Sequence, residues 1–211
     1  MKIKVVFMKR IIRGLFLFLA ISVLLVGCES AKDSQTEVTN TNTTESSSVN
    51  LTDKEGKDIL NELIPKAVDV YGMFNPPGYF KIDATKTIPG EAGYALVTEE
   101  NFKSVADLKK AVEEVFTEDF AQNRFYSHYL VLDEGTPPLY KDYEGKLYVD
   151  TDRGGHGWAT KFLIDTAKLK GQKENVAEIE LDITVLDEPS DPLTIKIENV
   201  NGKWLLASGL D

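Results

Sequence analysis

Cysteine and histidine are scarce in this chain of 211 residues, which has one cysteine, Cys28, and two histidines, His128 and His156. A single cysteine forms no disulfide within the chain and supplies no multi-cysteine metal site. The sequence has no H-E-x-x-H zinc motif, no G-x-S-x-G nucleophile elbow and no G-K-[ST] phosphate loop. These absences argue against the common zinc peptidases, serine hydrolases and P-loop enzymes, and we expect no catalytic activity, no cofactor and no metal.

Long apolar runs are also missing. The longest, residues 15–26, has about a dozen apolar residues, whereas a membrane-spanning helix needs roughly 20. The basic, acid-free segment MKIKVVFMKRIIRG precedes this run, which is typical of a secretory signal peptide. Met1 and Met8 are alternative starts, because MKRIIRG is a sufficient basic head by itself.

The single cysteine, Cys28, lies two residues after the end of this run. The segment Leu25-Val26-Gly27-Cys28 resembles the lipobox of bacterial lipoproteins. The resemblance implies cleavage before Cys28, a diacylglycerol on its sulfur and, in some members, a further acyl chain such as palmitate on the new amino terminus. The alternative is an unmodified cysteine in an ordinary signal sequence. Two or more acyl chains give stable anchoring, so we expect a protein anchored at the extracytoplasmic face of the cell membrane.

The expected boundaries divide the chain into a signal peptide at 1–27, a tether at 28–52 and one folded domain at 53–211. The tether is rich in Ser, Thr, Asn and Glu, and it has too little apolar content to offset the entropy of ordering. As a flexible coil, its 22 residues from 29 to 50 would span about 25 Å.

Basic residues are too few to balance the acids, and the formal net charge is −10. Cleavage before Cys28 would remove five bases and no acid, leaving 19 bases against 34 acids and a net charge of about −15. This charge argues against nucleic acid and anionic lipid as partners and is compatible with a basic partner or with cations. Plain solubility is the alternative explanation.

The hydrophobic pattern changes period along the domain, from helical to alternating. Helical spacing predicts helices over 53–71, 104–116 and 117–130, and Pro65 should kink or split the first. Alternation from Pro137 onward predicts hairpins around Glu144-Gly145 and Asn201-Gly202. Helices followed by a meander of strands predict an α+β fold with an antiparallel sheet.

Two segments contain candidate interface residues. In DTDRGGHGW, residues 150–158, Asp150 and Asp152 suggest a calcium loop, but Lys161 takes the place of the bidentate glutamate of an EF-hand. Another calcium site, a structural loop with Arg153 bound to carboxylates and glycines at positive φ, and a functional interface remain open. The second segment, residues 187–191, presents Asp187, Glu188 and Asp191 between two predicted strands.

Three stretches in order, DLKKAVEEVFTEDFAQNRF, YEGKLYVDTDRGG and a terminal NGKW, resemble the secreted DL-endopeptidase (autolysin) inhibitor family of Gram-positive bacteria. The closing hairpin by itself also resembles cystatin-like and NTF2-like domains. The family resemblance implies an α+β fold with two lobes and a cleft. It also implies binding to the catalytic domains of NlpC/P60 cysteine peptidases, which cut peptidoglycan stem peptides, through an acidic inter-strand loop.

The leading hypothesis is therefore a membrane-anchored, non-enzymatic inhibitor or regulator of NlpC/P60 endopeptidases. Its candidate interface residues are Asp187, Glu188, Asp191, Asp150, Asp152 and Arg153. A second hypothesis is a non-catalytic, ligand-binding lipoprotein of the cell envelope, with an apolar pocket lined by Tyr71, Phe74, Tyr79, Phe80 and Trp158. A third is a wall hydrolase that uses carboxylates, although no carboxylate pair stands out in the sequence.

Replacing Cys28 with Ala should abolish membrane anchoring, because the thiol that would accept the lipid is lost. We expect the Cys28→Ala protein in the culture medium or as an uncleaved precursor, measured by fractionation and immunoblotting. Unchanged membrane retention with normal cleavage would contradict lipidation at Cys28.

Overall fold

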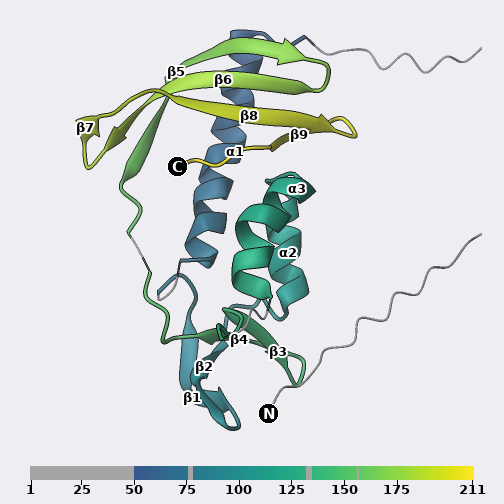
Figure 1. The fold of residues 1–211 in the computed structure, drawn as a ribbon, viewed down its shortest axis with the longest axis vertical. Coiled ribbons are helices and arrows are strands. Elements are labelled where there is room, and N and C mark those ends of the chain that lie inside the picture. The colour runs from purple at the N-terminus through teal and green to yellow at the C-terminus, as the bar shows by residue number, and fades with distance from the viewer. Residues whose placement is uncertain (1–49, 76–77, 132–134, 156) are drawn as a thin grey trace, which may run out of the picture. The chain divides into compact units, whose positions relative to one another are not determined.

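Helices and two separate antiparallel sheets make up the fold, which confirms the α+β class (Figure 1). The computed structural model describes residues 50–75, 78–131, 135–155 and 157–211, and all of its elements lie in one compact unit of the chain. Cys28, the expected signal peptide and most of the expected tether lie outside these residues. Among the described residues, no helix is long and apolar enough to cross a membrane.

Helix α1 (Asp53–Met73) begins at a capping box. The Glu55 N–H donates to the Thr52 side chain, and the Thr52 N–H donates to the Glu55 carboxylate at 2.8 Å. The helix continues through Pro65 as one element, so of the two expected effects of Pro65, a kink or a split, the split does not occur. Pro65 and Asn61 are both exposed, and the Asn61 carbonyl that loses its N–H partner is therefore open to water.

Sheet A contains β1 (Ile82–Ile88), β2 (Glu91–Val97), β3 (Tyr140–Tyr143) and β4 (Lys146–Asp150), in the order β1-β2-β4-β3. Its β3–β4 hairpin turns at Glu144 and Gly145, as predicted, with φ values of 49° and 71°. The β1–β2 hairpin precedes α2 and was not predicted. Most β1 side chains are exposed, so this strand lacks the alternation that identified the others.

Sheet B contains β5 (Thr160–Lys173), β6 (Val176–Val185), β8 (Leu193–Val200) and β9 (Lys203–Leu206), in the order β5-β6-β8-β9, with β7 (Glu188–Pro189) also paired to β6. Asn201 and Gly202, at φ 54° and 86°, form the predicted turn between β8 and β9. The strands therefore divide into two sheets, where the sequence predicted one meander. The break falls at residues 151–159, which lie between β4 and β5.

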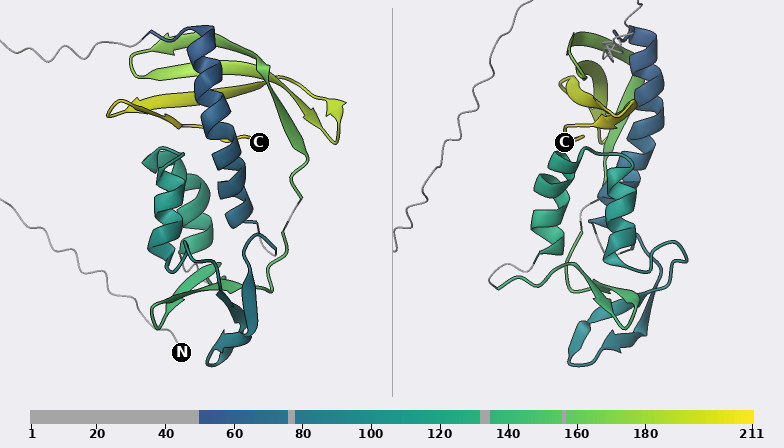
Figure 2. Two further views of the ribbon diagram at one scale, coloured as in Figure 1. Left: turned by 180° about the vertical axis from the view of Figure 1, so that it is seen from behind. Right: turned by 90° about the vertical axis from the view of Figure 1, so that its right-hand side faces the viewer.

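Beside α1 lie α2 (Val105–Glu113), α3 (Glu118–Ala121) and the π-helix η1 (Gln122–Leu130) (Figures 1 and 2). The Asp107 N–H donates to the Ser104 side chain, which confirms the predicted start of α2. Thr117 precedes α3 as predicted but makes no side-chain capping bond. The sequence predicted a helix over 117–130 but not its π-helical part.

One hydrophobic core joins the helices to both sheets. Near the start of α1, the Leu169 N–H donates to the Asp53 carboxylate at 2.8 Å, and Lys57 Nζ donates to the Asp165 carbonyl at 2.6 Å. At the other end, the Tyr140 hydroxyl of β3 donates to the Met73 carbonyl, and burial raises the pKa of that hydroxyl. Helix α1 is thus bonded to sheet B at its start and to sheet A at its end.

Phe116 lies at the centre of this core and is fully buried. Its ring contacts those of Tyr71, Phe120 and Phe125, with centroids 5.1–6.0 Å apart, and its backbone bridges to Leu206 of β9.

Phe116→Ala should lower the free energy of unfolding by about 3–5 kcal/mol, measured by urea denaturation. Leu163→Ala on β5, where the residue is 42% exposed, is the control and should cost less than about 1 kcal/mol. Equal effects would contradict this placement of the core.

Candidate functional site

In the first candidate segment, which starts at the end of β4, Asp150 and Arg153 are bound to groups within the chain. Asp150 is only 7% exposed; its Oδ1 accepts from the Asp152 N–H at 3.0 Å, and its Oδ2 lies 3.5 Å from Arg153 Nε. Arg153 also donates to the Pro137 carbonyl. These contacts agree with the interpretation of this segment as a structural loop in which Arg153 binds a carboxylate. The positive φ expected for its glycines is not found at Gly154.

Asp152 lies against the backbone of β2. A Cβ atom placed on Gly93 would be 2.6 Å from the Asp152 carboxylate, so that carboxylate takes the space of a side chain on β2. Among the residues that the structure describes, no three His, Cys, Asp or Glu side chains come together as a metal site. The contacts of Asp150 and Arg153 support a structural role for these two residues, whereas Asp152 is exposed, and all three remain second-choice candidates for the interface.

The second candidate segment is the β6–β7 tip, defined here as residues 185–191. Strands β6 and β7 pair through Thr184 with Pro189 and Val185 with Glu188, and the chain reverses at Leu186 and Asp187, both at positive φ. The Leu186 N–H donates to the Ala159 carbonyl at 3.1 Å, and the Ser190 N–H donates to the Ile183 carbonyl at 3.1 Å. The tip is therefore a bonded hairpin, where the sequence predicted a loop.

Every side chain of the β6–β7 tip is exposed, as expected. Leu186 is 77% exposed, the most exposed of the large apolar side chains in the described residues. Acidic groups flank it, and Asp187 makes an ion pair with Lys161 of β5 that is exposed on both sides. Such exposed pairs contribute little to stability. The tip thus combines the exposed apolar side chains of Val185 and Leu186 with the carboxylates of Asp187, Glu188 and Asp191.

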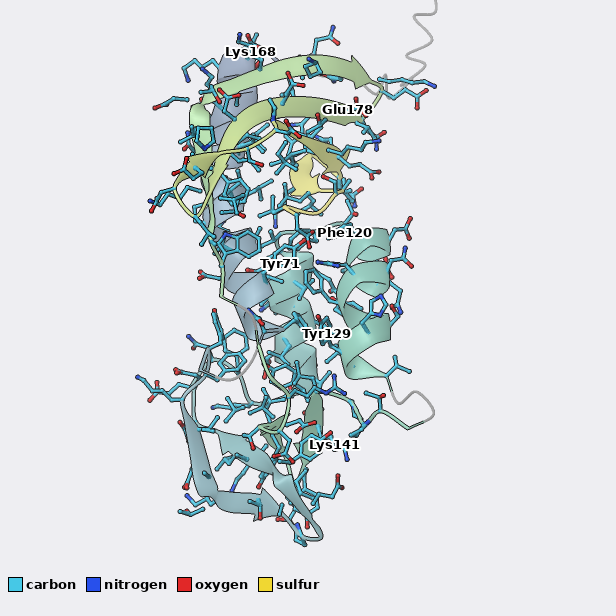
Figure 3. The ribbon with its side chains drawn as sticks, turned by 60° about the vertical axis from the view of Figure 1, so that its left-hand side comes forward. Tyr71, Phe120, Tyr129, Lys141, Lys168 and Glu178 are labelled. Carbon is cyan, nitrogen blue, oxygen red and sulfur yellow. The ribbon has the colours of Figure 1, made fainter. Side chains whose placement is uncertain are left out.

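A cavity of about 500 Å³ lies between the second half of α1, the π-helix η1 and the segment that leads into β5. We call it the aromatic pocket, because six aromatic side chains are among its lining residues: Tyr71, Phe74, Tyr79, Phe125, Tyr129 and Trp158. Figure 3 places Tyr71 and Tyr129 between sheet A, marked by Lys141, and sheet B, marked by Lys168 and Glu178. The volume of the aromatic pocket lies within the range of known small-molecule binding sites.

Ring contacts hold the walls of the aromatic pocket. Tyr71 lies 5.2 Å from Trp158 and 5.3 Å from Phe125, measured between ring centroids. Phe74 lies 4.9 Å from Phe125 and 5.4 Å from Tyr129. The Trp158 indole N–H donates to the Thr160 carbonyl at 3.0 Å, which fixes the orientation of the ring, yet Trp158 and Tyr79 each remain 38% exposed.

The charged side chains among the described lining residues of the aromatic pocket are two acids and one base: Asp69, Asp211 and Arg124. Arg124 makes an ion pair with Asp211, and its guanidinium carbon lies 5.6 Å from the Tyr71 ring centroid. Burial raises the pKa of Tyr71. Burial, followed by the charges of Asp69 and Glu99, raises the pKa of the Tyr79 hydroxyl.

Four of the five aromatic residues predicted for an apolar pocket line this cavity; the fifth does not. Phe80 is buried behind Tyr79, with its ring 4.8 Å away at 84°, and belongs to the core. The sequence did not predict Asp69, Arg124, Phe125 or Tyr129 at a site. In an α-helix, residues five apart do not share a face, whereas the i→i+5 bonding of η1 brings Arg124 and Tyr129 to the same cavity.

No family model, curated protein or solved structure matches this chain. The resemblance to DL-endopeptidase inhibitors therefore depends on the three sequence stretches alone.

Gly72 on α1 makes room for Tyr79 at the aromatic pocket. A Cβ atom at Gly72 would lie 2.6 Å and 2.8 Å from two carbons of the Tyr79 ring. Gly72→Ala should push this ring away and remove the NMR cross-peaks between the Tyr79 and Phe80 rings. Gly157, which also lines the pocket, has open space around it, and Gly157→Ala should keep those cross-peaks. Persistence of the cross-peaks in Gly72→Ala would contradict this packing.

Proposed function

We propose that the protein is a non-enzymatic inhibitor or regulator of peptidoglycan DL-endopeptidases of the NlpC/P60 type, anchored through Cys28 at the extracytoplasmic face of the membrane. In this proposal the β6–β7 tip binds the peptidase and occludes its active site. The observation that carries the proposal is the exposed apolar side chain of Leu186 at the end of a bonded, acidic hairpin.

The rigidity of the β6–β7 tip supports a binding role. Backbone bonds to Ala159 and Ile183 already hold the turn at Leu186 and Asp187, so little conformational entropy would be lost when a partner binds it. An exposed leucine suits an apolar subsite in a groove that binds extended chains, and its burial in the complex would favour association. The pairing of β7 with β6 fixes the direction of the tip relative to sheet B.

Charge supports the same proposal. The tip carries three carboxylates, of which only Asp187 is in an ion pair among the described residues. The chain as a whole is acidic. Complementary charge raises the association rate with a basic partner, and salt screens the attraction beyond about 8 Å at physiological ionic strength. We therefore expect association with the peptidase to slow as salt rises.

Neutralising the tip should weaken binding to an NlpC/P60 catalytic domain without unfolding the protein. The variant combines Asp187→Asn, Glu188→Gln and Asp191→Asn, all at exposed positions. At low salt we expect its Kd to rise at least about tenfold, with the difference shrinking at high salt. Calorimetric titration at two salt concentrations gives the Kd, and the melting temperature should stay nearly unchanged.

A control variant carries the same change in net charge at exposed sites away from the tip: Asp58→Asn, Glu62→Gln and Glu144→Gln. It should bind nearly as the unchanged protein does. Equal weakening by the two variants would mean that overall charge, and not the tip, determines binding. Lack of binding to any NlpC/P60 domain at either salt concentration would overturn the proposed function.

A second candidate function, a ligand-binding lipoprotein of the cell envelope, is favoured by the aromatic pocket. Its volume of about 500 Å³, its exposed Trp158 and Tyr79 and its charged rim are typical of a site for a small molecule. The two functions use different residues of one chain, so the tip variant leaves every lining residue of the aromatic pocket unchanged.

A further inference from the structure

We propose that the aromatic pocket binds a small organic ammonium ion against the wall formed by the rings of Trp158, Tyr71 and Tyr79, with the Asp69 carboxylate as its counter-ion. This inference rests on the second proposed function, ligand binding at this cavity, and names the class of ligand. It is independent of whether the β6–β7 tip binds a peptidase.

Several rings at one cavity give a cation more than one face to contact. Trp158, Tyr71 and Tyr79 come from three segments of the chain and all line the cavity. A cation within about 6 Å of a ring centroid is attracted by the ring, and tryptophan attracts it most strongly. Tyr71 already has a cationic neighbour at such a distance, since the Arg124 guanidinium lies 5.6 Å from its centroid.

The charges at the aromatic pocket favour a cation over an anion. Among the described residues that line it, the one base is Arg124, which is already paired with Asp211. Asp69 is exposed, and no lysine or arginine in the described part of the chain lies within ion-pair distance of it. Asp69 is nevertheless close enough to Tyr79 to raise the pKa of its hydroxyl, second to burial. One carboxylate therefore lies beside an aromatic wall without a cation of its own.

The shape of the aromatic pocket depends on the Gly72 backbone, against which the Tyr79 ring lies. A side chain at position 72 would displace that ring and remove one wall. Glycine inside a helix costs about 1 kcal/mol relative to alanine, and Gly72 lies in the last turn of α1. The Tyr79 ring fills the space that a side chain at position 72 would need, which explains the glycine there.

The test compares choline with its neutral isostere 3,3-dimethylbutan-1-ol, which has the same shape without the charge. Each is titrated into the ¹⁵N-labelled protein, and the indole N–H signals of the two tryptophans, Trp158 and Trp204, are followed by NMR. Trp204→Phe assigns the signals. We expect choline to shift the Trp158 signal with a Kd at least about tenfold lower than that of the alcohol, and Trp204, which does not line the pocket, to stay unshifted.

Two matched variants locate the counter-ion. Asp69→Asn should reduce the preference for choline over the alcohol at least about fivefold. Asp58→Asn removes a carboxylate from the same helix outside the pocket and should leave the preference unchanged. Gly72→Ala should weaken choline binding, and Gly157→Ala should not.

Three outcomes would overturn the inference. Equal affinity for choline and the alcohol would show a ligand pocket without cation preference. Failure of both to shift the Trp158 signal would remove the ammonium site and the second proposed function together. Unchanged preference in Asp69→Asn would reject Asp69 as the counter-ion. None of these results bears on binding of the β6–β7 tip to an NlpC/P60 domain, which is titrated separately.

Discussion

The backbone of α1 must remain helical from Asp53 to Met73, because its two ends are bonded to different sheets. At its start Asp53 and Lys57 bond to β5 of sheet B, and at its end the Met73 carbonyl accepts from Tyr140 of sheet A. At 1.5 Å per residue, 21 residues extend about 31 Å. A break near Pro65 would separate these two sets of bonds, and the exposed position of Pro65 is what allows the helix to continue.

The continuity of α1 through Pro65 also positions one wall of the aromatic pocket. The pocket residues from Val68 to Asn75, in the last turns of α1 and just after it, lie beyond Pro65, where the helix approaches sheet A. The opposite wall comes from η1 and from the segment that precedes β5. The Ala159 carbonyl of that segment accepts from the Leu186 N–H, so Trp158 of the pocket and the turn of the β6–β7 tip are one residue and one hydrogen bond apart.

Local patterns predicted most of the fold. Serine and threonine caps, helical spacing and the Glu144-Gly145 and Asn201-Gly202 turns act within a few residues, and the structure has them, except that Thr117 makes no side-chain capping bond. The β1–β2 hairpin was not predicted, because almost all side chains of β1 are exposed. The division into two sheets was not predicted either, because it depends on pairings between segments far apart in the sequence. No local pattern expresses such pairings.

The candidate sites likewise combine features that local sequence predicts with features that depend on tertiary packing. Exposure of residues 187–191 followed from their acidic composition, whereas burial of Asp150 required knowing that β4 pairs with β2 and β3 on its two sides. Four pocket aromatics were predictable by residue type. Asp69 and Arg124 were not, because the pocket that unites them depends on how α1 and η1 pack and on the i→i+5 bonding of η1.

The proposal that the β6–β7 tip enters the active site of a cell-wall peptidase is tested most directly by photo-crosslinking from Leu186. A p-benzoylphenylalanine residue at position 186 is irradiated with an NlpC/P60 catalytic domain, and a matched probe at the exposed Glu144, on the β3–β4 turn, is the control. Our account predicts an adduct from position 186 that maps to the substrate groove of the peptidase, and none from position 144. An adduct outside the groove, equal adducts from the two positions, or none from position 186 under conditions where the two proteins bind, would contradict it.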